Sequence, residues 1–179
     1  MKYFLIAITA LVTFGALGQT SDEPFYKSYQ LGTGDKISIL VYGEDDLSFD
    51  IRIGMDGVIR YPFLGDIQVI GKTVEELNRT ITEGLRGDYL DEPNVNVAVE
   101  EYRPFYILGE VVSPKHYQYQ PGMTVRQAIA ISGGLNERAS SSNIQLKRKT
   151  GNESQVFENV SLDEEILPGD IITVAQRFF

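Results

Sequence analysis

Residues 71–87 read GKTVEELNRTITEGLRG and residues 122–134 read GMTVRQAIAISGG, and these two stretches decide the fold. In the first, Thr73 is followed three residues later by Glu76, which is the spacing of a capping box at the start of a helix. The second stretch has a threonine and a glutamine at the same spacing. We therefore expect one helix in each half of the chain.

Apolar residues recur three or four positions apart in both stretches, as in a helix with one buried face. In the first stretch they are Val74, Leu77, Ile81 and Leu85. In the second, the same spacing is shown by Val125, Ala128, Ile129 and Ser132. A glycine pair at 133–134 then ends the second helix. Each stripe has to be covered by a sheet.

Short runs rich in β-branched and aromatic residues surround the two helices. We expect strands at residues 36–41, 49–53, 58–63, 67–70, 95–99, 105–108, 117–119, 144–147 and 171–174. Between the second and third runs, Asp56 and Gly57 predict a hairpin, because glycine accepts the positive φ of a tight turn. Strands interrupted by one helix in each half predict an α+β fold.

The two ends of this strand-rich region resemble each other. Residues 31–41 read LGTGDKISILV and residues 167–174 read LPGDIITV, so each places Gly-Asp before an isoleucine-rich strand. Glycine makes the tight turn, and the aspartate side chain can accept backbone amide hydrogen bonds there. We interpret Asp35 and Asp170 as turn residues rather than catalytic carboxylates.

The composition excludes several classes of function. The chain has 179 residues, with 16 Lys plus Arg against 25 Asp plus Glu and a formal charge of -9. A protein that neutralises phosphates needs an excess of cations, so no nucleic-acid partner is expected. The absence of cysteine from the sequence excludes disulfides, thiolate zinc sites and cysteine nucleophiles, and we expect no lipid anchor.

The first residues predict export from the cytoplasm. Met1 and Lys2 precede an uncharged, mostly apolar run that ends in small residues near Gly18. This pattern is typical of a secretory signal peptide, here residues 1–18, and predicts a periplasmic protein. An uncleaved signal anchor is the alternative, although the run is short for a membrane span of about 20 residues.

Residues with catalytic potential lack the partners that chemistry requires. His116 stands between a lysine and a tyrosine, without Ser or a second His in motif spacing. The acidic runs at 44–46 and 163–165 are adjacent residues of polar loops, which favours solvated turns over a carboxylate pair or a calcium loop. We expect no enzyme activity, no metal site and no cofactor.

Surface contact is the remaining role for the notable side chains. Tyrosines can stack on sugar rings or belong to half-buried sheets, and both roles stay open. The basic cluster of the chain faces water at a strand end or contacts an acidic partner or polymer. Arg103 is held extended by Pro104, which suits a strand crossing between domains or a subunit contact. The candidate contact residues are Tyr102, Arg103, Tyr106, Tyr117, Tyr119, Lys147, Arg148 and Lys149.

Three segments together resemble the Wza-type bacterial polysaccharide export family. They are YQLGTGDKISILVYGEDDLS from residue 29, RIGMDGVIRYPFLGDIQVIGKTVEEL from residue 52, and YLDEPNVNVAVEEYRPFYILGEVVSPKHYQYQPGMTVRQAIAISGGL from residue 89. The resemblance implies a mixed β-sheet export domain with one helix at residues 19–103. It implies a soluble-ligand-binding (SLBB) domain of the β-grasp fold at residues 104–179.

The resemblance also implies a function in capsule or exopolysaccharide export. Large family members carry repeated β-grasp domains and a C-terminal helix that forms an outer-membrane pore, and we expect neither here. The expected partners are further copies in a ring, an inner-membrane polysaccharide co-polymerase, a separate outer-membrane β-barrel and the polymer. The alternative is a periplasmic saccharide-binding or adaptor module that senses or links envelope components.

Overall fold

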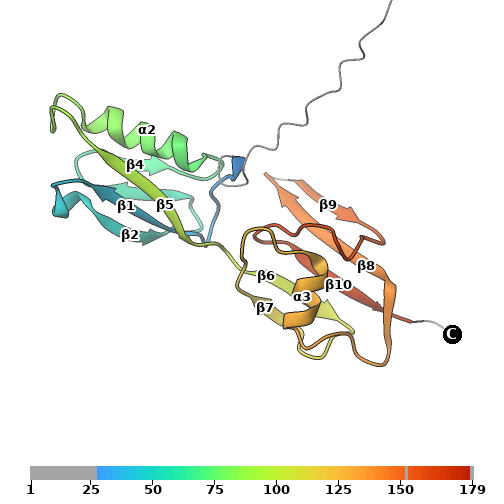
Figure 1. Cartoon of the computed structure of the whole chain (residues 1–179). Coiled ribbons are helices and arrows are strands. Elements are labelled where there is room, and N and C mark those ends of the chain that lie inside the picture. Colours follow the sequence, from blue (N-terminus) through green and yellow to red (C-terminus); the bar gives the residue numbers. More distant parts are fainter. Residues whose placement is uncertain (1–27, 152, 178–179) are drawn as a thin grey trace, which may run out of the picture.

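The computed structural model describes residues 28–151 and 153–177, which form two lobes joined by one crossing of the chain between β5 and β6 (Figure 1). The predicted signal peptide lies outside the described residues. Each lobe has its own hydrophobic core, and Tyr102 packs against both cores. The domain boundary predicted between Arg103 and Pro104 therefore falls where the chain passes from one core to the other, and it remains our proposal.

The N-terminal lobe, residues 28–101, packs one helix on antiparallel strands. A three-stranded sheet has the order β2-β1-β5, and β3 pairs with β4 in a separate hairpin. The elements are β1 (Lys36–Val41), η1 (Asp45–Leu47), β2 (Phe49–Arg52), β3 (Val58–Tyr61), β4 (Gly65–Gln68), α2 (Val74–Leu85) and β5 (Val95–Glu101). Helix α2 buries Leu77, Ile81 and Leu85, so the apolar stripe is confirmed.

The C-terminal lobe, residues 105–177, wraps a mixed sheet around one short helix. Its strand order is β7-β6-β10-β8-β9, in which β10 runs parallel to β6 and antiparallel to β8. The elements are β6 (Phe105–Gly109), β7 (Lys115–Tyr117), α3 (Val125–Ile131), β8 (Ala139–Thr150), β9 (Glu153–Phe157) and β10 (Ile171–Gln176). This arrangement confirms the predicted α+β class.

Both helices begin at the predicted capping boxes. The Thr73 hydroxyl accepts from the Glu76 amide at 3.2 Å, and the Glu76 carboxylate accepts from the Thr73 amide at 2.8 Å. Thr124 and Gln127 make the same reciprocal pair at 3.4 and 3.0 Å. These pairs satisfy amides that have no acceptor within the helix, which fixes where each helix begins.

The predicted hairpin at Asp56 and Gly57 is wrong. A turn does form there, with the Gly57 amide donating to the Gly54 carbonyl at 3.1 Å and Gly57 at φ +70°. However, β2 pairs with β1, whereas β3 pairs with β4, so the turn carries the chain from one sheet to another. A turn sequence encodes reversal of direction, and strand pairing depends on which apolar faces can be buried together.

The strands of the C-terminal lobe also differ from the prediction. Strand β8 runs from Ala139 to Thr150, far beyond the four residues expected, and β9 was not predicted. Strand β7 covers residues 115–117, two residues before the expected run. The β8–β9 hairpin extends to the edge of the sheet and is mostly polar, so its residues lack the apolar alternation that reveals a half-buried strand.

The parallel pairing of β6 and β10 predicts a strict requirement for glycine at position 109. Gly109 has φ +82°, and an added Cβ would overlap the carbonyl oxygen of Val174 on β10. We expect Gly109→Ala to lower the free energy of unfolding by about 1–3 kcal/mol more than a glycine substitution without a steric clash. Urea denaturation measures this difference.

Gly122→Ala is the matched control. Gly122 has a similar φ of +79°, but nothing lies within 4 Å of its added Cβ. In this variant the free energy of unfolding should fall only by the cost of placing an alanine in the left-handed conformation, about 1–2 kcal/mol. Equal losses for the two variants would show that the close approach at Val174 is not a constraint on the fold.

Candidate functional site

The echoed Gly-Asp turns form the centre of the junction between the lobes. Asp35 and Asp170 are both fully buried, with 0% and 1% of their surface exposed. In each turn the carboxylate Oδ2 accepts from the amide three residues earlier, Gly32 at 2.8 Å and Leu167 at 2.7 Å. The predicted turn role is therefore what these two carboxylates do, since each accepts a backbone amide of its own turn.

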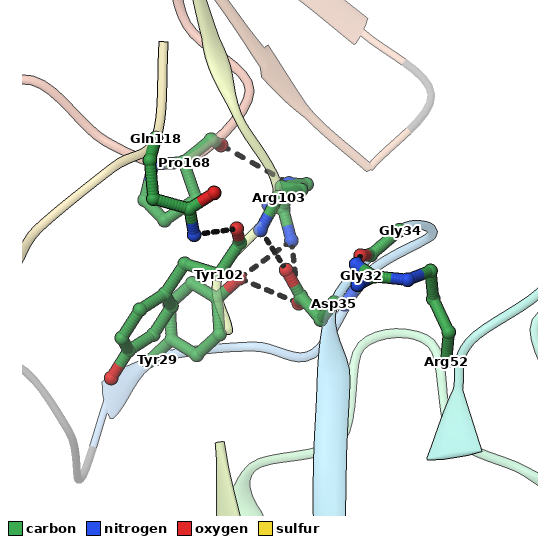
Figure 2. Close-up of polar contacts among 9 residues, drawn as sticks. All are labelled: Tyr29, Gly32, Gly34, Asp35, Arg52, Tyr102, Arg103, Gln118 and Pro168. Carbon is green, nitrogen blue, oxygen red and sulfur yellow. Dashed lines mark hydrogen bonds and ion pairs between the residues drawn. The ribbon is translucent and has the colours of Figure 1, made fainter. Parts of the chain in front are cut away.

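Arg103 binds Asp35 and reaches the second turn as well (Figure 2). Its backbone amide donates to Asp35 Oδ1 at 2.8 Å, and its Nη1 donates to Oδ2 at 3.0 Å. Its Nε donates to the Pro168 carbonyl at 3.1 Å. One side chain thus connects the strand entering β1 with the turn before β10, so the lobes meet through Arg103.

Arg148 makes the corresponding ion pair with Asp170. Its Nε lies 3.1 Å from Asp170 Oδ1 and its Nη2 lies 2.8 Å from Oδ2. Nη2 also donates to the carbonyl of Glu165 at 3.0 Å. A guanidinium and a carboxylate that are joined by two parallel hydrogen bonds form a strong, directional contact. Arg148 therefore organises the C-terminal lobe and has little capacity left for a ligand.

Three tyrosine rings line the junction on the side of Arg103. Tyr102 makes edge-to-face contacts with Tyr29, at 5.0 Å between centroids, and with Tyr119, at 5.5 Å. The Tyr29 hydroxyl donates to Asp35 Oδ2 at 2.6 Å and accepts from Arg103 Nη1 at 2.7 Å. Burial, followed by the nearby Asp35 charge, raises the pKa of Tyr29 above its ordinary value, and burial raises the pKa of Tyr119 to about 12. These hydroxyls are neutral structural groups at physiological pH.

A groove of about 530 Å³ opens at this junction. It is lined by both turns and by Arg103, Arg148 and Lys149. Two of these three cations are neutralised by buried carboxylates, whereas no carboxylate of the described residues lies within 4 Å of Lys149. The groove, which we call the junction groove, therefore offers the ammonium group of Lys149 to a ligand, whereas many of the backbone amides around it donate within the protein.

The other predicted contact residues lie apart from this groove. Tyr106 on β6 is 43% exposed, and Lys147 on β8 is exposed. Tyr117 is half-buried against Phe105, and its hydroxyl donates to the Ser113 carbonyl at 2.7 Å. Tyr119 is only 3% exposed, so its ring has almost no surface for a sugar. The eight residues do not form one site, and their role in polymer contact stays a prediction.

An exposed aromatic pair at the far end of the N-terminal lobe was missed from the sequence. Phe63 and Tyr89 stack with centroids 4.7 Å apart and are 65% and 45% exposed. Phe63 has φ +63°, and the Leu64 amide donates across it to the Pro62 carbonyl at 2.7 Å. This tight three-residue turn is strained for a residue with a side chain, by about 1–3 kcal/mol. The available signal was Pro62-Phe63-Leu64-Gly65, in which two apolar residues stand in a turn between proline and glycine.

Neighbouring contacts hold Phe63 outward despite the strain. Leu64 packs against the first core beside Gly84 of α2, where an added Cβ would come within 2.9 Å of the leucine side chain. The Tyr89 hydroxyl lies 3.5 Å from the Phe63 carbonyl. The pair, which we call the aromatic platform, is thus fixed from both sides. Strained residues of this kind are concentrated at functional sites.

The buried ion pair predicts that replacing Arg103 without also replacing Asp35 destabilises the protein. Arg103→Gln leaves the fully buried Asp35 charge without its cation, so we expect the free energy of unfolding to fall by about 3 kcal/mol. Adding Asp35→Asn removes the buried charge and restores part of this loss. Urea denaturation of the single and double variants measures the coupling.

Arg126→Gln is the control for this experiment. Arg126 pairs with Asp163 at 2.9 Å, but both side chains are more than half exposed. Exposed pairs contribute about 0–1 kcal/mol, so this variant should unfold nearly as the parent does. An Arg103→Gln variant as stable as Arg126→Gln would contradict the structural role of the junction.

Two negative observations limit the chemistry of the described residues. Within residues 28–151 and 153–177, no group of three or more His, Asp or Glu side chains is placed to hold a metal ion. Over the same residues, neither helix has the length and apolar character needed to cross a membrane.

Comparison with protein families divides the chain at the same junction. Residues 23–100 match the model for polysaccharide biosynthesis/export proteins, and residues 104–158 match the model for the SLBB domain. The gap between the two matches contains Tyr102 and Arg103.

Individual relatives agree with these matches. The exopolysaccharide production protein ExoF of Rhizobium meliloti is 33% identical over 73% of this chain and 33% of its own length. The EPS I polysaccharide export outer membrane protein EpsA of Ralstonia nicotianae is 26% identical over 83% of this chain and 48% of its own. The polysialic acid transport protein KpsD of Escherichia coli is 27% identical over 82% and 26%.

The chain spans between about a quarter and a half of the length of these relatives. Their names describe production, export or transport of polysaccharides. The resemblance predicted from the sequence is confirmed: this chain belongs to the polysaccharide biosynthesis/export family and carries an SLBB domain after its export region.

Proposed function

We propose that this protein is a non-enzymatic component of a capsule or exopolysaccharide export apparatus in the periplasm. Copies of the chain form a ring that guides the polymer from an inner-membrane polysaccharide co-polymerase to a separate outer-membrane β-barrel. Family membership supports the polysaccharide as cargo. The observation that carries the proposal is the aromatic platform, because a strained, exposed stacking surface serves contact rather than stability.

The junction supports a role without catalysis. A catalytic carboxylate needs an accessible oxygen and a pKa matched to its task. Asp35 and Asp170 instead have their oxygens occupied by arginine groups and turn amides, below the protein surface. Exposed aromatic faces such as that of Phe63 can instead bind a sugar without changing it.

The aromatic platform suits a sugar chain that must move. A pyranose ring places C–H groups against the negative face of an aromatic ring. Such a contact is weak and tolerates many sugars, so a polymer can pass without being held. The outer face of Phe63 is available for it, since the ring is 65% exposed although Tyr89 covers its other face.

A saccharide-binding or adaptor module is the second candidate function. The junction groove, at about 530 Å³, has the volume of a small-ligand site and presents the Lys149 ammonium group. Titration with short oligosaccharides separates the candidates. Micromolar affinity that is lost in Lys149→Ala favours the module, whereas no measurable affinity together with loss of export on deletion favours the conduit.

Removing the aromatic platform should impair export without unfolding the protein. In Phe63→Gly the left-handed turn becomes unstrained, which offsets the lost ring contact, so stability should stay within about 1 kcal/mol of the parent. We expect at least a tenfold decrease in polymer delivered to the cell surface. Tyr42→Ser, which removes another aromatic side chain, 63% exposed, should export normally. Normal export in Phe63→Gly would refute the polymer-contact role.

Ring formation has its own measurement. We expect the purified full-length protein to sediment as a defined oligomer whose population rises with concentration. A ring requires a contact between two different surfaces of neighbouring copies, closed by their angle. Sedimentation as a monomer at every concentration, alone and with the co-polymerase, would contradict the ring.

A further inference from the structure

The sheet of the C-terminal lobe has one covered face and one open face. Alternate strand residues, among them Phe105 and Ile107 of β6 and Ile172 of β10, pack with α3 in the second core. The residues between them point to the opposite face, because side chains alternate along a strand. Tyr106 and Leu108 of β6 lie there and are 43% and 45% exposed. We call this side of the sheet the open face.

One row of residues crosses the open face through all five strands. From β7 to β9, the strand register places side by side His116, Tyr106, Ile171, Lys147 and Val156. Neighbouring strands lie about 4.8 Å apart, so the backbones at Tyr106 and Lys147, two strands apart, are separated by about 10 Å. An aromatic ring, an aliphatic side chain and an ammonium group therefore follow one another across the sheet.

The open face carries cations without acidic partners. Lys147 is exposed, as is Lys149 at the end of the face, where it also lines the junction groove. No carboxylate of the described residues lies within 4 Å of either ammonium group, and no described strand places Asp or Glu on this face. On the corresponding face of the N-terminal lobe, Lys36 instead pairs with Asp50 at 3.4 Å and Glu100 at 2.6 Å. Cross-strand ion pairs thus neutralise that lysine and leave those of the open face available.

The net charge of the chain is distributed unevenly between the lobes. Residues 28–103 contain 15 acidic and 7 basic side chains, whereas residues 104–177 contain 8 acidic and 7 basic ones. At physiological ionic strength, interactions between exposed charges are largely screened beyond about 8 Å. An anionic ligand at the open face is therefore attracted by the nearby lysines more than it is repelled by the distant excess of carboxylates.

We propose that the open face binds an acidic polysaccharide, whose sugars lie along the row and whose anionic groups pair with Lys147 and Lys149. The C–H groups of a sugar contact the ring of Tyr106 and the side chain of Ile171. The anionic groups are carboxylates or other negatively charged substituents of the sugars. This inference rests on the proposed export function and adds to it the chemical class of the cargo.

The composition of the row favours a polymer over a protein as the ligand. A stable protein interface buries about 800 Å² on each partner, and lysine is depleted from its apolar core. On the open face, Lys147 stands directly beside Ile171 in the row. A polysaccharide needs only a narrow strip of surface and presents C–H groups and anionic groups side by side, as this row requires.

Binding of three polymers to the purified full-length protein tests the class of ligand. Polygalacturonate carries a carboxylate on every sugar, dextran is a neutral polysaccharide, and polyglutamate is an acidic polypeptide. We expect polygalacturonate to bind best at low ionic strength and to be released by salt. Dextran binding as tight as that of polygalacturonate would overturn the requirement for anionic groups. Equal binding of polyglutamate would overturn the recognition of sugars.

Paired variants locate the contact on the protein. Lys147→Gln should weaken polygalacturonate binding about fivefold, near the upper limit for one exposed ion pair. Arg79→Gln is its control, because it removes the same charge from an exposed position on α2. Tyr106→Ser should also weaken binding about fivefold. Its control is Ile131→Ser, which removes a 47% exposed side chain from α3 on the covered side of the sheet. Circular dichroism verifies that all four variants fold.

Equal effects of Lys147→Gln and Arg79→Gln would show that the net charge, and not the open face, governs binding. That result, or no measurable binding of polygalacturonate, would overturn the proposal and leave the export function standing. The export function is tested separately, by the polymer delivered to the cell surface when the chain is deleted. Normal delivery after deletion would overturn the export function even if polygalacturonate binds.

Discussion

The buried ion pair between Asp35 and Arg103 is the interaction on which the arrangement of the two lobes depends. Asp35 is fully buried and accepts from the Gly32 amide, the Tyr29 hydroxyl, and the amide and side chain of Arg103. A carboxylate taken out of water is tolerated only when its oxygens are satisfied in this way. Such a pair adds little net stability, but it admits few alternative geometries. It therefore fixes the direction in which the chain leaves β5.

A second buried ion pair, between Asp170 and Arg148, has the same arrangement within the C-terminal lobe. Asp170 closes the turn before β10, and Arg148 holds it from the neighbouring β8. Arg103 also donates to the Pro168 carbonyl of that turn, so the two turns are part of one network. Two of the three cations that line the junction groove, Arg103 and Arg148, are therefore neutralised by ion pairs within the protein. A surface charge read from sequence is a poor guide to binding until its partners are known.

The sequence patterns predicted the local features more reliably than the pairings. Both capping boxes, both helical stripes and the turn role of Asp35 follow from residues within a few positions of one another, and each was predictable. The error at Asp56 and Gly57 concerned which strands pair, and that choice depends on how distant apolar faces are buried together. Nothing near Asp35 in the sequence pointed to Arg103, its partner 68 positions away. The platform was missed because Phe63 joins Tyr89 through tertiary structure alone.

The interior and the surface of this protein use aromatic residues in opposite ways. Tyr29, Tyr102 and Tyr119 lie in contact where the lobes meet, and burial raises the pKa of each of their hydroxyls, so they remain neutral. Phe63 is instead kept in an unfavourable backbone conformation that a glycine would adopt freely, with its ring in water. Packing cannot account for that cost, because the ring buries little surface. A contact made outside the monomer can account for it, and a polymer or another protein chain arriving at this end of the lobe would bury the exposed face of the ring.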